Sequence, residues 1–296
     1  MLKKIIIPEI KSYERKYEVS AGIFINVKVI YREELAGRKA LYLHGGGIYG
    51  DHTLAVRPSE WLVKNKIFDL IILPDRIGSG KSSAFTKQMS IKEQGEIMSS
   101  LLDVLKIDES ITVIGSSYGG LIALLLASID KRINKVILPG SSPTLANPFN
   151  LIKFLGYTGI LKIFIKLMLY VYLGKSKPAF IDQDEFYDLN DTGSFTKLAL
   201  KVLKHTDRNQ LRSMLYKVDS LLDINNLSIP EDLKLSIPVI QVIGEKDEFW
   251  GRDIPEIFKK NLPLLKRSVI KGASHKDLIQ KAEVFHSEAV RLLREG

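Results

Sequence analysis

Two patterns of hydrophobic and polar residues divide the chain, and one gives way to the other near residue 39. Before about residue 33, apolar and polar positions mostly alternate, with Ala21-Gly22 between two alternating runs. Alternation at a period of two is typical of strands with one buried face. This segment is therefore predicted to form an antiparallel hairpin.

From Lys39 onward, the apolar residues come in short runs of consecutive positions instead of alternating with polar ones. They occupy residues 40–43, 68–73, 111–114, 135–138, 238–243 and 268–270. Such runs suit parallel strands that are buried on both faces. Apolar spacing at 91–105 and 119–127 predicts helices between them. The alternation favours an α/β fold, with a mostly parallel sheet flanked by helices on both sides.

This alternation stops between about residues 143 and 235, where no clear strand is visible. The stretch holds a dense apolar segment at 149–173, a polar segment at 175–194, and helical patterns near 195–203 and 210–222. We therefore predict two parts. Residues 1–142 and 236–296 form the core, and residues 143–235 form a helical cap inserted between two strands.

One strand-to-helix junction has the form expected of a nucleophilic serine. The strand at 111–114 runs into Gly115-Ser116-Ser117-Tyr118-Gly119-Gly120, and a helical segment follows. A serine on so sharp a turn projects its hydroxyl above the sheet edge, and glycines two positions to either side avoid clashes. The start of the helix directs N–H groups toward a developing oxyanion. Ser117 is therefore the candidate nucleophile, and the competing interpretation is a glycine-rich turn that only packs closely.

An activated serine needs a base, and His275 is the candidate. It follows the last predicted strand, so its loop would bring the imidazole to the sheet edge that carries Ser117. The competing interpretation is a histidine at a helix N-terminus. His286 falls in the middle of the terminal helix and is interpreted as a surface or packing residue, and His205 falls inside the predicted cap.

The base needs a carboxylate that orients it and stabilises its charged form. Asp247 directly follows a predicted strand, with Glu245 and Glu248 as neighbouring alternatives. The end of the strand before the cap, residues 138–143, carries no carboxylate, which favours Asp247. The acid then lies between the serine and the histidine along the chain, the order expected when the nucleophile sits on such a turn.

The segment after the first parallel strand is the candidate oxyanion hole. It begins His44-Gly45-Gly46-Gly47, and glycines let backbone N–H groups approach a substrate oxygen. We expect the N–H groups of Gly46 and Tyr118 to be the donors, with Gly47 as the alternative to Gly46. His44 and Gly45 would support the loop. A flexible glycine turn after a strand is the competing interpretation.

A second glycine-rich segment imitates a phosphate-binding loop. It follows a strand and ends in Gly80-Lys81-Ser82. A P-loop needs glycine five residues before Gly80, where Asp75 stands, and no strong helix follows. We therefore expect no nucleotide site here.

In combination, these segments resemble the α/β-hydrolase superfamily over most of the chain outside the predicted cap. The run from Asp75 to Ser82 is similar to the family's Asp-Arg-x-Gly-x-Gly-x-Ser loop, and the oxyanion loop, elbow, acid and base positions match in order. The resemblance implies an α/β-hydrolase fold with an eight-stranded, mostly parallel sheet and a helical cap after the sixth strand.

The expected activity is that of a carboxylesterase-like serine hydrolase, which cleaves an ester through a Ser-His-Asp triad and an acyl-enzyme. A peptidase or an acyltransferase would use the same triad. Gly47 stands where similar proline-type aminopeptidases carry proline, which weakens that alternative. Serine also argues against dehalogenases and epoxide hydrolases, which resemble the fold but use aspartate. A non-catalytic binding protein on the same fold is the alternative from another class.

Composition limits the cofactors, partners and location. The chain has 296 residues and no cysteine, which excludes disulfides and thiolate metal sites. His44 and His52 have no third ligand at usable spacing, so no metal or other cofactor is expected. The net charge of +9 comes from scattered lysines, which favours a solvated basic surface over nucleic-acid binding. The short N-terminal apolar run does not resemble a signal peptide, and a cytoplasmic location is expected.

The apolar segment at 149–173 bears on the substrate. Lys162 and Lys166 interrupt it, so it is too short for a membrane span of about 20 apolar residues. We interpret it as a cap helix whose apolar side covers the site, which favours a small apolar acyl substrate. The alternative is a cationic lid that makes transient contact with an anionic membrane surface. The sequence does not indicate an oligomeric state.

Overall fold

The computed structural model describes residues 9–32, 37–45, 50–144, 228–250 and 253–295, together with positions 213, 216, 217, 219, 220, 223 and 226. Most of the predicted cap at 143–235 therefore lies outside the described residues, and the division into core and cap stays a prediction. Its two ends do meet, since Thr144 and Ser228 form an isolated antiparallel bridge.

The predicted hairpin is confirmed and forms one edge of the sheet. β1 (Lys11–Ser20) pairs with β2 (Ile23–Tyr31) in antiparallel register around Ala21-Gly22. Gly22 has a φ of 74°, a left-handed value that glycine adopts without a steric penalty. β2 then pairs antiparallel with β4, which joins the hairpin to the rest of the sheet.

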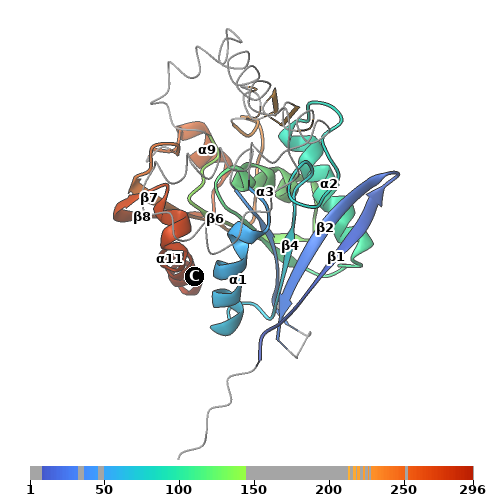
Figure 1. Cartoon of the computed structure of the whole chain (residues 1–296). Coiled ribbons are helices and arrows are strands. Elements are labelled where there is room, and N and C mark those ends of the chain that lie inside the picture. Colours follow the sequence, from blue (N-terminus) through green and yellow to red (C-terminus); the bar gives the residue numbers. More distant parts are fainter. Residues whose placement is uncertain are drawn as a thin grey trace, which may run out of the picture.

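All six apolar runs are strands, and they pair in parallel. The sheet has eight strands in the order β1-β2-β4-β3-β5-β6-β7-β8, so it is mixed but mostly parallel, with the hairpin at one edge and β8 at the other (Figure 1). The parallel strands are β3 (Lys39–Leu43), β4 (Leu70–Pro74), β5 (Ile111–Gly115), β6 (Ile133–Pro139), β7 (Val239–Lys246) and β8 (Leu265–Ser274).

Helices cover both faces of the sheet and create two hydrophobic cores. Successive β3 residues point to opposite sides, with Leu41 and Leu43 in one core and Ala40 and Tyr42 in the other. The first core packs against α2 (Ile91–Val104) and α3 (Tyr118–Ile129), and the second against α1 (Thr53–Lys64) and α11 (Ala282–Arg294). The short helices are α9 (Glu256–Asn261) and α10 (Asp277–Gln280).

His286 shows how a polar residue is accommodated in the second core. It is 2% exposed, and its imidazole contacts the Tyr42 hydroxyl at 2.9 Å and the Ala282 carbonyl at 2.6 Å. Burial lowers its pKa to about 4, so the ring is neutral at pH 7. It is thus a packing residue, one of the two roles predicted for it. Among the described helices, none is long and apolar enough to cross a membrane.

Candidate active site

The turn between β5 and α3 holds Ser117 in a strained backbone conformation. Its φ of 50° and ψ of −127° lie in a region that residues with a Cβ rarely adopt. The flanking glycines explain how so tight a turn fits. A Cβ on Gly115 would lie 2.6 Å from the Gly119 carbonyl oxygen, and a Cβ on Gly119 would lie 2.2 Å from that of Leu43. The turn therefore requires the glycines that the sequence pattern contains.

The structure brings the three predicted residues Ser117, His275 and Asp247 into one hydrogen-bonded chain. The Ser117 hydroxyl lies 3.0 Å from Nε2 of His275, and Nδ1 of His275 lies 2.8 Å from Oδ2 of Asp247. Because a carboxylate only accepts, the geometry fits a ring that carries its proton on Nδ1. Nε2 is then free to accept from the serine hydroxyl.

Asp247 is the carboxylate that reaches the imidazole. Its side chain is fully shielded from solvent, and Oδ1 accepts backbone N–H groups of Phe249 and Trp250 at 2.9 Å each, which leaves Oδ2 for His275. The neighbouring glutamates contact the backbone of the histidine loop instead. Glu245 accepts the Gly272 N–H at 2.8 Å, and Glu248 accepts the His275 N–H at 3.4 Å.

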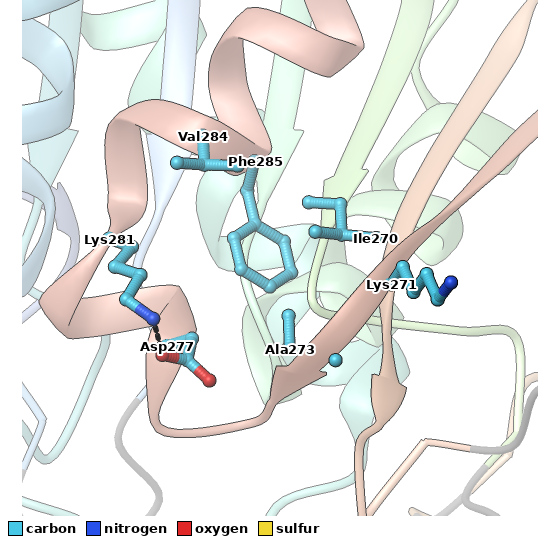
Figure 2. A pocket seen from close by; sticks show the side chains of 8 residues that line it. Ile270, Lys271, Ala273, Asp277, Lys281, Val284 and Phe285 are labelled. Carbon is cyan, nitrogen blue, oxygen red and sulfur yellow. Dashed lines mark ion pairs between the residues drawn. The ribbon is translucent and has the colours of Figure 1, made fainter.

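A second carboxylate holds the loop that carries His275. Asp277 Oδ2 accepts both the backbone N–H and the hydroxyl of Ser274 at 2.8 Å, and its Oδ1 pairs with Lys281 at 2.9 Å. Figure 2 shows this ion pair beside Phe285, at a pocket of about 190 Å³ that is also lined by Ile270 and Ala273. The Phe249 ring packs edge-on against the imidazole, with 4.9 Å between ring centroids.

The start of the predicted oxyanion loop packs directly against the turn that carries Ser117. A Cβ on Gly45 would lie 2.7 Å from the Cβ of Ser117. Gly46 and Gly47 lie outside the described residues, so their predicted roles stay predictions. Tyr118 is the first residue of α3, and within the described part of the chain its N–H donates to no protein acceptor.

His44 is part of the support for this loop. It is fully buried, its Nδ1 lies 2.8 Å from the Gly45 carbonyl oxygen, and its Nε2 accepts the backbone N–H of Arg76 at 3.2 Å. Burial and the nearby Arg76 charge hold its pKa well below the usual range. The imidazole is therefore a neutral bridge between two loops.

Arg76 is a site residue that the sequence did not predict. It was noted only as the arginine of the family's Asp-Arg-x-Gly-x-Gly-x-Ser loop, with no role assigned to it. It is 2% exposed, and its guanidinium donates to the His44 carbonyl at 3.1 Å and to the Gly45 carbonyl at 3.2 Å. The same group lies 5.2 Å from the centroid of the Tyr118 ring. Burial lowers its pKa to about 10, so it stays charged at neutral pH.

The segment that imitates a phosphate-binding loop encloses its own carboxylate. Asp75 accepts from the Asn26 amide, from both the backbone and Nδ1 of His52, and from the Lys81 backbone, all within 2.7–2.9 Å. A Cβ on Gly80 would lie 2.3 Å from Asp75 Oδ2. Donors from three segments of the chain are thus directed at the Asp75 carboxylate.

His52 is accordingly bound to a carboxylate, and His44 to a backbone carbonyl. Among the described residues, no group of three histidines, aspartates or glutamates is arranged to hold a metal ion.

The fold and this loop arrangement define the class of protein. A family model described as alpha/beta hydrolase fold matches residues 68–282, which is more than half of the chain. The chain belongs to this family, as the resemblance implied, and the family supports hydrolysis as the general reaction. A comparison with curated proteins finds none that matches.

Solved structures of similar fold extend over nearly the whole chain. 2-Hydroxy-6-oxo-6-phenylhexa-2,4-dienoate hydrolase from Rhodococcus sp. strain RHA1 is 19% identical, with a TM-score of 0.69 over 97% of this chain and 100% of that one. A thermophilic esterase from Thermogutta terrifontis is 18% identical, with a TM-score of 0.67 over 96% of this chain and 98% of that one. The epoxide hydrolase CorEH is 18% identical, with a TM-score of 0.63 over 97% and 99%. Similarity at this level of identity shows the fold alone.

Proposed function

We propose that this protein is a serine hydrolase that cleaves a carboxylic ester through an acyl-enzyme. The observation that carries the proposal is the unbroken chain of hydrogen bonds from Ser117 through His275 to Asp247, with the serine held on a strained turn. A group that merely packs needs neither the strain nor a titratable partner at hydrogen-bond distance.

In the proposed reaction, the Ser117 hydroxyl attacks the ester carbonyl while Nε2 of His275 accepts its proton. The tetrahedral intermediate collapses to the acyl-enzyme, and His275 returns the proton to the departing alcohol. Water then attacks the acyl-enzyme by the same route, with His275 again acting as the base, and the acid is released. Asp247 holds the imidazole in the required tautomer and stabilises its charged form.

The negative charge that develops on the substrate oxygen needs backbone donors. The N–H of Tyr118 meets this need at the start of α3, where the helix dipole adds positive potential. We assign the second donor to Gly46, with Gly47 as the alternative. Each such donor lowers the barrier by about 2.7–4 kcal/mol in comparable sites.

The class of acyl substrate is the open part of the proposal. One similar structure is an esterase and another is a hydrolase of a phenylhexadienoate, so proteins of this fold act on more than one kind of substrate. We favour a small, apolar carboxylic ester because the segment expected to cover the site is rich in large apolar residues. A peptidase or an acyltransferase would use the same residues.

The first experiment is labelling with a fluorophosphonate, which forms a covalent bond to an activated serine. We expect the native protein to be labelled, and Ser117→Ala to lose labelling and at least about 10⁴-fold in esterase rate, because the attacking atom is gone. Ser116→Ala is the matched control, one position away in the same turn, and should keep labelling. Folded native protein that fails to react would overturn the proposal.

A substrate series then separates the acyl chemistries. p-Nitrophenyl esters of increasing chain length and amino-acid p-nitroanilides should be compared by kcat/KM. We expect hydrolysis of the short and medium esters and little hydrolysis of the anilides. Faster cleavage of the anilides would assign the triad to a peptidase.

A further inference from the structure

The Arg76 guanidinium stands behind both parts of the oxyanion hole proposed above. It hydrogen-bonds the carbonyl oxygens of His44 and Gly45, and it lies against the ring of Tyr118. Its own backbone N–H donates to the His44 imidazole. Arg76 thus makes three hydrogen bonds to the start of the glycine loop and one ring contact to Tyr118, the proposed donor on α3.

These contacts fix backbone carbonyl groups at the start of the glycine loop. In a trans peptide unit, the carbonyl and the following N–H point in opposite directions. A cation that holds the Gly45 carbonyl oxygen therefore constrains the peptide plane to which this carbonyl belongs. Gly45 in turn packs against the turn that carries Ser117, so a shift of this peptide plane would also disturb the surroundings of the nucleophile.

We propose that Arg76 is a positioning residue for the reaction, whose guanidinium fixes the oxyanion loop and the Tyr118 ring in one arrangement. The inference rests on the proposed function. Arg76 does not touch the substrate, because it is 2% exposed and its donors are directed at backbone carbonyls.

The choice of arginine is explained by geometry. A guanidinium is a rigid planar fork that can hold two carbonyls and stack on an aromatic ring, whereas an ammonium is a point charge on a flexible stem. Two neighbouring carbonyls at 3.1 and 3.2 Å and a ring at 5.2 Å match the fork and its flat face. Lysine should therefore keep the charge and lose the positioning.

The loop that carries Arg76 is itself anchored. Lys217, which falls in the predicted cap, is buried and donates to the Gly78 carbonyl at 3.2 Å and to the Ser79 hydroxyl at 2.6 Å. Asp75 is held by the hydrogen bonds described above. Arg76 is thus placed by rigid neighbours on both sides, as a positioning role requires.

The experiment compares Arg76→Lys, Arg76→Gln and Arg132→Lys. Arg132 is the matched control: it also donates to two backbone carbonyls, those of Ile107 and Ser99, but at the start of β6. Active sites are counted by fluorophosphonate titration, so that kcat refers to competent enzyme only. We expect both Arg76 variants to lose about 10- to 100-fold in kcat with KM changed less than about threefold, since small misplacements act mainly on the transition state.

A second readout separates positioning from structural support. A boronic acid forms a tetrahedral adduct on the serine and uses the oxyanion hole, so its Ki should rise in parallel with the loss of kcat/KM in the Arg76 variants. Arg132→Lys should change neither value. If the Arg76 variants melt at lower temperature but keep native kcat and boronate affinity per titrated site, the inference is wrong. If the native protein does not react with the fluorophosphonate at all, the proposed function fails first.

Discussion

Two glycine-rich loops follow buried parallel strands in this protein, and their hydrogen bonds differ in kind. In the loop after β4, the Asp75 carboxylate is saturated by four donors from the protein itself. In the loop after β5, the Ser117 hydroxyl faces a titratable imidazole, and the N–H of Tyr118 has no acceptor among the described residues. In the first loop, donors of the protein hold the carboxylate, whereas the second loop presents a serine hydroxyl beside an imidazole.

This difference teaches how to weigh a motif. Both loops contain glycines at positions that leave no room for a Cβ, so glycine spacing alone does not tell them apart. What separates a supporting loop from a reactive one is where its donors and acceptors are used. Altering each loop should therefore have different consequences, mainly for stability in the first and for rate in the second.

The largest expected effect is on the rate, and it comes from Asp247, the carboxylate that holds the imidazole beside the loop after β5. Asp247→Asn should lower kcat by about 10⁴-fold, because an amide favours the wrong imidazole tautomer and no longer stabilises the charged ring. Steady-state kinetics on an ester measures this. Glu245→Gln and Glu248→Gln are matched controls on the same turn and should stay within about tenfold of native, since the two carboxylates accept backbone N–H groups of the histidine loop, whereas Asp247 holds the imidazole. A larger loss in either glutamate variant than in Asp247→Asn would reassign the acid.

The reactive site was largely predictable because its residues carry local signals. Short apolar runs located the parallel strands, and Ser117, Asp247 and His275 each follow such a run at the carboxyl edge of the sheet. The order of these residues along the chain and their places at strand ends were then enough to predict that Ser117 and His275, 158 positions apart, belong to one site. The hairpin was predictable for the same reason, since alternation reports a half-buried strand.

The contacts of the loop after β4, which carries Asp75 and Arg76, were not predictable from the sequence. Nothing local in the sequence distinguishes the buried Arg76 from a solvated arginine, because its partners are backbone carbonyls of another segment. Helix α1 was also missed: Pro58 and the buried Ser59 interrupt its apolar pattern. Burial of polar groups depends on long-range contacts, which periodicity does not report.

The next largest effect is on stability, and it tests the loop after β4 that carries Asp75. Asp75→Asn should lower the free energy of unfolding by about 3–5 kcal/mol, because an amide nitrogen would face donors that now reach a buried carboxylate. Urea unfolding followed by circular dichroism measures the change. The control is Glu14→Gln, which alters a more exposed partner of Asn26 and Lys81 and should cost less than about 1 kcal/mol. Equal losses in the two variants would show that the enclosed carboxylate is not special.

The smallest effect is the change in the free energy of unfolding as the pH falls, which reports the contribution of the Asp75 charge. Hydrogen bonds from His52 and Lys81 outweigh burial and lower the pKa of Asp75 to about 2, against an ordinary value of 3.8. Between these values the unfolded chain binds the proton more tightly, so the carboxylate stabilises the fold fully above about pH 5 and loses this contribution as the pH falls toward 2. The loss is about 2 kcal/mol.

The measurement is the difference in unfolding free energy between the native protein and Asp75→Asn at several pH values from 6 to 2. Glu14 and Asp51 titrate in both proteins, so their direct contributions largely cancel in this difference. We expect the gap to shrink by about 2 kcal/mol across the range. A gap that stays constant would mean that hydrogen-bond geometry, rather than the charge of Asp75, stabilises the loop, and that the two glycine-rich loops differ less in electrostatics than their contacts indicate.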